Sequence, residues 1–250
     1  MVGKRVLVVR AQRDSDEFLA LLQRAGSVVD CLPIMSIQPL EESPEIKRAI
    51  LDFDLNDRTI FISVYAARLG LHWIDQYWPM LPLGMAYFAV GNQTAKVLRD
   101  SGCDVTTPHS EFTTEGLLAM PELQDLEGRR VLIFCGSGGR QKLADSLLLR
   151  GARVDSCALY RRCIKEQNLQ LARAQLAQTD CLVVHSGQLL QALAAPPAKI
   201  AARLSLVVPS PRLGAMAEEL GYRRVEIAQS AAPLAMYAAT KTVLQTLRGA

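Results

Sequence analysis

The chain has 250 residues, of which half are hydrophobic and 21% are charged, and its formal net charge is +3. This composition supports one large domain or two ordinary ones with a sizeable core, and it argues against intrinsic disorder. The small net charge without a Lys/Arg run argues against a dedicated nucleic-acid binder, and no apolar run reaches the length of a membrane span.

The cysteines and histidines show no metal-binding pattern. None of the six cysteines forms a CxxC pair, and His72, His109 and His185 are scattered. We therefore predict no metal and reduced thiols, which are typical of the cytoplasm. We also expect no signal peptide, because the apolar run at residues 6–9 has the length of a strand and is closed by Arg10.

The first third of the chain predicts a strand, a helix and a second strand. The Val/Leu run at residues 6–9 indicates a buried strand, and Asp14 or Ser15 can cap the helix that follows. The second strand begins at residues 28–32 and leads into an extended, proline-bounded stretch at 33–39. Three more strands, each followed by a helix, are expected at residues 59–63, 85–90 and 105–106.

The second half predicts the same alternation. Residues 131–134 form a strand, a glycine-rich turn follows, and a helix at about 141–150 leads to a strand that ends at Tyr160. Further strands with following helices are expected at residues 181–184, 204–208 and 225–228. Alternating helices and buried strands predict an α/β fold with parallel sheets.

One sequence unit occurs twice. RVLVV at residues 5–9 matches RVLIF at 130–134, and LLQRAGSVVDC at 21–31 matches LLLRGARVDSC at 147–157. The two copies lie about half a chain apart, which predicts two similar lobes.

Six predicted strands end in polar or glycine-rich turns that begin helices. These turns begin at Arg10, Ser63, Gly91, Gly136, Ser186 and Ser210. Ligands of open parallel sheets bind outside the carboxyl ends of the strands. Two lobes with three such turns each would therefore frame a cleft.

The glycine turn CGSGGR at residues 135–140 has two competing ligand interpretations and a structural one. It lacks the GxGxxG spacing of a dinucleotide loop, because Gln141 stands where the third glycine is expected. A turn that holds carboxylates is therefore favoured over a nucleotide site. A tight turn with packing glycines stays open as the structural alternative.

Several hydroxyl groups at strand ends have both structural and functional interpretations. Ser63 and Ser186 do not lie in GxSxG, so they are interpreted as helix caps or ligand donors rather than as nucleophiles. His185 is a candidate base or a structural residue. Tyr160 is a packing residue or a functional one, and neither interpretation is excluded.

Three arginines occupy strand-end turns. Arg10, Arg140 and Arg212 stand at equivalent places, and arginine suits carboxylates through its bidentate geometry. This pattern indicates an acidic ligand. Arg161 and Arg162, beside Tyr160, are interpreted as solvated, although either could meet an acidic substrate.

Together these motifs resemble the uroporphyrinogen-III synthase family over nearly the whole chain. The resemblance is carried by VLVVR at 6–10, the strand-end serine with Ala66-Ala67, AVG at 89–91 with Thr94-Ala95, GSGGR through YRR at 136–162, and VVPSPRLGAMAEELGY at 207–222. The family commonly has arginine where this chain has Cys135.

The resemblance implies two flavodoxin-like lobes with parallel sheets, joined by a two-stranded linker, with a cleft between them. One lobe would be discontinuous, with residues 1–35 plus 168–250, and the other would span 40–160. Residues 36–39 and 161–167 would be the linker strands, with a hinge there.

The resemblance also implies a reaction without cofactor or metal. Hydroxymethylbilane would lose water from ring A, and the resulting cation would attack ring D, form a spiro intermediate and reclose as uroporphyrinogen III with ring D inverted. Tyr160 would hydrogen-bond the leaving hydroxyl. The expected carboxylate-binding residues are Arg10, Ser63, Gly91, Thr94, Gly136, Gly138, Arg140, Ser186, Gly187, Ser210 and Arg212.

The expected partners are therefore hydroxymethylbilane and uroporphyrinogen III, with no nucleic acid and no membrane. We expect a cytoplasmic monomer that contacts the preceding enzyme of its pathway transiently. Two alternatives stay open. A two-lobed module could bind a polycarboxylate without turnover, and a nucleotide-dependent oxidoreductase would explain the glycine turn only.

Overall fold

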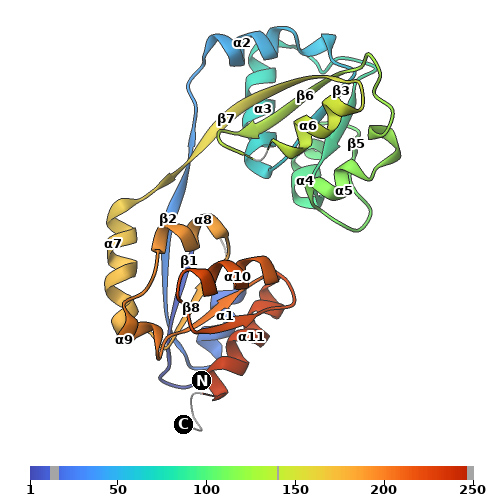
Figure 1. The fold of residues 1–250 in the computed structure, drawn as a ribbon. Helices are drawn as coiled ribbons and strands as arrows, with labels where there is room; N and C mark the ends of the chain where they lie inside the picture. Colours follow the sequence, from blue (N-terminus) through green and yellow to red (C-terminus); the bar gives the residue numbers. More distant parts are fainter. Residues whose placement is uncertain (12–16, 140, 247–250) are drawn as a thin grey trace. The chain divides into compact units, whose positions relative to one another are not determined.

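The computed structural model describes residues 1–11, 17–139 and 141–246, and Arg140 lies outside these ranges together with the candidate caps Asp14 and Ser15. The chain divides into two compact units (Figure 1). Unit 1 comprises Met1–Ser36 and Cys163–Ala250, and unit 2 comprises Ile37–Arg162. No helix in the described ranges is both long enough and apolar enough to cross a membrane.

Unit 1 is built on five parallel strands. They are β1 (Arg5–Ala11), β2 (Val28–Pro39, which continues into unit 2), β8 (Cys181–Val184), β9 (Ser205–Val208) and β10 (Arg224–Ile227). Its helices are α1 (Glu17–Arg24), α7 (Glu166–Gln175), α8 (Gly187–Leu193), α9 (Ala198–Ala201), α10 (Pro211–Glu219) and α11 (Pro233–Thr246). The strand order is β2-β1-β8-β9-β10, which is 2-1-3-4-5 when the strands are counted along the chain.

Unit 2 has the same number of parallel strands. They are β3 (Arg58–Phe61), β4 (Ala86–Ala89), β5 (Val105–Thr106), β6 (Arg130–Gly136) and β7 (Arg153–Ile164, which continues into unit 1). Its helices are α2 (Pro44–Leu51), α3 (Val64–Tyr77), α4 (Asn92–Asp100), α5 (Thr114–Leu118) and α6 (Lys142–Leu149). The order β7-β6-β3-β4-β5 matches unit 1 strand for strand, but the chain enters it at a different point.

The sequence repeat therefore coincides with a structural one. The two copies form β1–α1–β2 and β6–α6–β7, and each lies in its sheet beside three more parallel strands. The prediction of an α/β fold on parallel strands is confirmed. Strands β2 and β7 are neighbours in the sheet order. Lys165 N–H donates to Ile34 O (2.8 Å) and Leu40 N–H donates to Leu159 O (2.9 Å), so the two strands run in opposite directions and make the sheet mixed.

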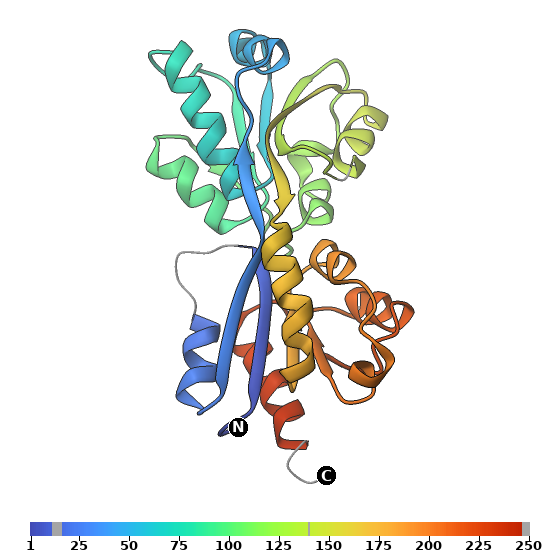
Figure 2. The same ribbon diagram turned by 90° about the vertical axis from the view of Figure 1, so that its left-hand side faces the viewer.

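Each unit buries both faces of its sheet. Side chains alternate along a strand, so Leu7 and Val9 of β1 join one core with α7, α8 and α10, while Val6 and Val8 join another with α1 and α11. Figure 2 shows α7, in yellow-orange, alongside the blue strands of unit 1. In unit 2, Phe61 packs with α2, α3 and α4, and Ile60 packs with α5 and α6.

The strand boundaries differ from expectation at the two crossings between the units. The stretch at residues 33–39 is no separate element, because β2 runs unbroken from Val28 to Pro39. At the other crossing, β7 ends at Ile164 and residues 166 and 167 already belong to α7, with Glu166 in the first turn, where a carboxylate favours the helix dipole.

Candidate functional site

Ser63 lies where β3 ends and α3 begins in unit 2. It is the N-cap of α3, with an extended backbone (φ −165°, ψ 161°), and its Oγ accepts the Ala66 N–H at 3.0 Å. The same oxygen shares a hydrogen bond of 3.0 Å with the Tyr160 hydroxyl. The geometry thus brings together two residues that are 97 positions apart in the sequence and that were both predicted as site residues.

A β-bulge aims Tyr160 at this point. Cys135 of β6 lies opposite Ala158 of β7, but the register then shifts, so that Leu159 is passed over and Gly136 lies opposite Tyr160. A Cβ on Gly136 would stand 2.6 Å from Cε2 and Cζ of the Tyr160 ring. The ring therefore lies directly on the Gly136 backbone, and only glycine allows this approach.

Tyr160 is covered on its other sides. Its exposed fraction is 1%. The Tyr65 ring lies 5.9 Å away at a tilt of 52°, and the Arg162 guanidinium carbon lies 5.9 Å from the Tyr160 ring centroid. The phenol is thus both a packing residue and a hydrogen-bonding one, and the covering side chains have to move before a ligand can reach its hydroxyl.

The other predicted positions of unit 2 offer mainly backbone groups. Gly91 is the N-cap of α4 and has no side chain to cap it, while Thr94 in the same helix is buried, with 4% exposed. Gly138 has a φ of +70°, which favours glycine, in the turn after β6. Arg140 lies outside the described residues.

Unit 1 places two serines and two arginines at strand ends. Ser186 caps α8 by accepting the Leu189 N–H at 3.4 Å, and Ser210 is the N-cap of α10, where its side chain makes no capping bond. Arg212 reaches toward α8, with Nη1 3.8 Å from the place that a Cβ on Gly187 would take. Arg10, at the end of β1, is 6% exposed.

The two units differ at the position of the phenol. The same register shift occurs after Arg10 in β1, and it sets Ala11 opposite Met35, just as Gly136 is set opposite Tyr160. Met35 is buried and apolar. The same strand geometry therefore holds a pair of hydroxyl groups in unit 2, whereas unit 1 has a methionine in place of the tyrosine.

Three other reactive side chains are buried or packed against the core. Burial raises the pKa of the Cys103 thiol to about 11 and that of Cys157 to about 12, so both thiols are protonated at neutral pH. His185 packs edge-on against Phe18, with ring centroids 5.9 Å apart. Within the described ranges, no group of three or more His, Cys, Asp or Glu side chains is arranged to hold a metal ion.

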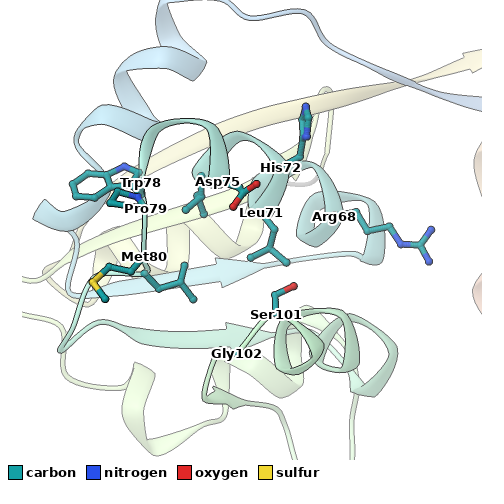
Figure 3. A pocket seen from close by; sticks show the side chains of 11 residues that line it. Arg68, Leu71, His72, Asp75, Trp78, Pro79, Met80, Ser101 and Gly102 are labelled. Carbon is teal, nitrogen blue, oxygen red and sulfur yellow. The ribbon is translucent and has the colours of Figure 1, made fainter.

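A surface pocket of about 630 Å³ lies along α3 in unit 2 (Figure 3). It is lined by Arg68, His72 and Asp75 of α3, by the loop that starts at Trp78, and by Ser101 after α4. Its loops precede β4 and β5, so they lie at the amino ends of the strands. Ligands of such sheets bind at the carboxyl ends, where Ser63 and Tyr160 lie.

The sequence predicted the two residues of the hydroxyl pair, Ser63 and Tyr160, but not their hydrogen bond. Tyr65 was missed, although it follows the cap residue of α3 by two positions and therefore had to lie in the first helical turn. The bulge has no signal in the sequence, since it depends on how β6 and β7 pair. The glycine at 136 was the one available sign of a close approach.

Hydroxyl, glycine and arginine groups at the carboxyl ends of parallel strands define an α/β protein that binds a polar small molecule. A family model described as Uroporphyrinogen-III synthase HemD matches residues 3–238. The chain belongs to the uroporphyrinogen-III synthase family.

Curated relatives agree with this assignment. The uroporphyrinogen-III synthase of Escherichia coli (strain K12) is 32% identical over 237 residues, which cover 90% of this chain and 95% of the relative. The enzyme of Salmonella typhimurium (strain LT2) shows the same identity and the same coverage.

Two solved structures share the fold. A mutant uroporphyrinogen III synthase from the extremely thermophilic bacterium Thermus thermophilus superposes with a TM-score of 0.69 at 19% identity, covering 98% of this chain and 100% of that one. The synthetase from Helicobacter pylori 26695 gives a TM-score of 0.57 at 14% identity, covering 96% and 99%.

Proposed function

We propose that this chain dehydrates and cyclises hydroxymethylbilane to uroporphyrinogen III, as a hydro-lyase of tetrapyrrole biosynthesis. The observation that carries this proposal is family membership along residues 3–238, together with 32% identity to a synthase over 90% of the chain. The hydroxyl pair in unit 2 agrees with a reaction that begins with departure of a hydroxyl group.

The chemistry asks the protein for positioning and for hydrogen-bond donors. Hydroxide leaves the hydroxymethyl carbon of ring A with a proton, as water, and leaves an azafulvene cation. This cation bonds to the substituted carbon of ring D, and the spiro intermediate fragments and recloses with ring D inverted. The protein lowers the first barrier by stabilising the leaving oxygen, and it favours the spiro route by holding the chain of pyrroles in place.

Tyr160 is the proposed donor to the leaving hydroxyl. Its Oη already shares a hydrogen bond with Ser63 Oγ, which in turn accepts the Ala66 N–H at the start of α3. When Ser63 donates its own proton to Tyr160, the phenol proton is left for the substrate. The substrate reaches it once Tyr65 and Arg162 move from the ring.

The substrate's carboxylates are proposed to bind at the strand-end turns. Arg212 beside Gly187 supports this, because a guanidinium near the start of a helix adds a charged donor to backbone N–H groups. Thr94 and Arg10 are both buried, which makes the exposed groups the stronger candidates. The full proposed set is Arg10, Ser63, Gly91, Thr94, Gly136, Gly138, Arg140, Ser186, Gly187, Ser210 and Arg212.

We propose further that the two units are flavodoxin-like lobes joined by β2 and β7, with the linker strands at residues 36–39 and 161–164. The order 2-1-3-4-5 of unit 1 supports this, since it is the flavodoxin order. The cleft expected between the lobes stays a prediction, as do the cytoplasmic location, the monomeric state and a transient contact with the preceding enzyme.

A binding module without turnover is the second candidate, and the burial of Tyr160 favours it. One experiment separates the two functions. Purified full-length protein is added to hydroxymethylbilane, the products are oxidised, and the type-I and type-III isomers are separated. An enzyme yields mostly type III, whereas a binding module leaves the type-I excess of the uncatalysed control.

A further inference from the structure

Arg162 is an exposed cation on the same strand face as the buried Tyr160. Successive side chains of a strand alternate between its faces, so residues 160 and 162 of β7 point to one side. The Arg162 guanidinium carbon lies 5.9 Å from the Tyr160 ring centroid. The strand thus carries a fixed positive charge directly beside the only phenol that Ser63 contacts among the described residues.

The charge of Arg162 is not neutralised in the described part of the chain. No carboxylate oxygen there lies within 4.0 Å of its guanidinium, which lies over the Tyr160 ring instead. Some other arginines of unit 2 are occupied: Arg129 pairs with Asp57 at 3.0 Å, and Arg150 donates to Leu123 O. Arg162 therefore has its full set of N–H donors available for an anion.

We propose that Arg162 binds a carboxylate of the substrate and, in doing so, leaves the Tyr160 ring, which removes one of the two side chains that cover it. This inference rests on the proposed function, because the acidic substrate supplies the carboxylate. An exposed guanidinium is held less strongly by a ring face than by a carboxylate that accepts two of its hydrogens. Substrate binding and partial uncovering of Tyr160 are thereby coupled in one residue.

Arg161 is the matched control. It is adjacent in sequence, carries the same charge and is also exposed, but it lies on the opposite face of β7 and donates from Nε to Gln38 Oε1 at 3.1 Å. A nonspecific effect of positive charge near the substrate would act through both residues. A specific carboxylate contact acts through Arg162 alone.

The test measures KM and kcat for type-III product with Arg162→Met, Arg162→Lys and Arg161→Met. Methionine keeps an apolar stem over Tyr160 but removes the charge. We expect Arg162→Met to raise KM about tenfold or more, as for loss of a charge-assisted hydrogen bond, with Arg161→Met within about twofold of the wild type. Arg162→Lys should recover part of the loss, and the KM difference should shrink at high salt.

Equal KM values for the two methionine variants, or a wild-type KM in Arg162→Met, would overturn the inference. Equilibrium binding of uroporphyrinogen III under reducing conditions is the second measurement, with the same expected ratio of dissociation constants. It tests Arg162 even where no type-III product forms. A wild type that binds but gives no type-III product refutes the proposed function, and leaves Arg162 to be decided by binding alone.

Discussion

Ser63 uses one oxygen atom for two structural tasks. It accepts the Ala66 N–H that would otherwise be unpaired at the start of α3, and it holds the Tyr160 hydroxyl in place. Its counterpart Ser186 does only the first of these, for Leu189 in α8. The duplication of the fold thus supplies an internal comparison between a serine that only caps and one that also contacts a phenol.

This comparison predicts unequal costs for the two serines. Ser63→Ala should lower the free energy of unfolding by about 2 kcal/mol, because it loses both bonds, and Ser186→Ala by about 1 kcal/mol. Urea denaturation of each variant measures the loss. In Tyr160→Phe the cost of Ser63→Ala should shrink toward that of a cap alone. Equal losses in the two serine variants would show that the Ser63–Tyr160 bond contributes nothing.

An aspartate joins two strands at the amino end of each sheet. Asp57, before β3, accepts the Arg130 N–H of β6 at 2.8 Å, and Asp180, before β8, accepts the Arg5 N–H of β1 at the same distance. Each aspartate also donates its own N–H to the carbonyl of that arginine, at 3.0 Å. The two aspartates make the same hydrogen bonds at corresponding places, as expected of a duplicated fold. These bonds fix the register of the two neighbouring strands, and the register in turn sets where the groups at the strand ends lie.

Asp57 should make the free energy of unfolding of unit 2 depend on pH in the acid range. The Arg130 N–H, and then the Arg129 guanidinium, hold the pKa of this carboxyl below its usual value. A lowered pKa in the folded state gives a stabilisation that is complete above the unfolded pKa, near 4, and that is lost as the pH falls through the folded value.

Asp57→Asn should therefore lose about 1 kcal/mol at pH 7, and the difference from wild type should shrink as the pH falls below about 4. Asp100→Asn is the control, since Asp100 pairs with Lys96 on the exposed face of α4, and this substitution should cost about 0.5 kcal/mol or less. Thermal unfolding between pH 2 and 8 measures both. A difference that is constant over this range would contradict the role given to the Asp57 charge.

Unit 2 has the parts of an independent domain. Its two cores contain only its own residues, and its chain is continuous from Ile37 to Arg162. We predict that residues 37–162 fold alone and unfold cooperatively in urea. A fragment that begins at residue 58 should fail, because it lacks Ile46, Ile50 and Phe53 of the core. A noncooperative transition for 37–162 would mean that unit 2 depends on unit 1.

The sequence predicted the alternation of strands and helices, because buried strands appear as short Val/Leu runs such as residues 6–9 and 181–184. It also predicted the duplication, since both copies retain their glycine stops. The depth of Tyr160 and its bond to Ser63 could not be read from it. Both depend on the bulge after Cys135, and the register of a strand pair is set by tertiary packing rather than by local pattern.

The role of the Tyr160 hydroxyl is tested by Tyr160→Phe. The substitution keeps the ring on Gly136 and removes only the hydroxyl, so the loss of stability should be about 1 kcal/mol. Type-III product from hydroxymethylbilane is measured for wild type and variant at equal folded concentration. We predict a fall in kcat of about a hundredfold with folding nearly normal. An unchanged rate of type-III formation would remove Tyr160 from the mechanism.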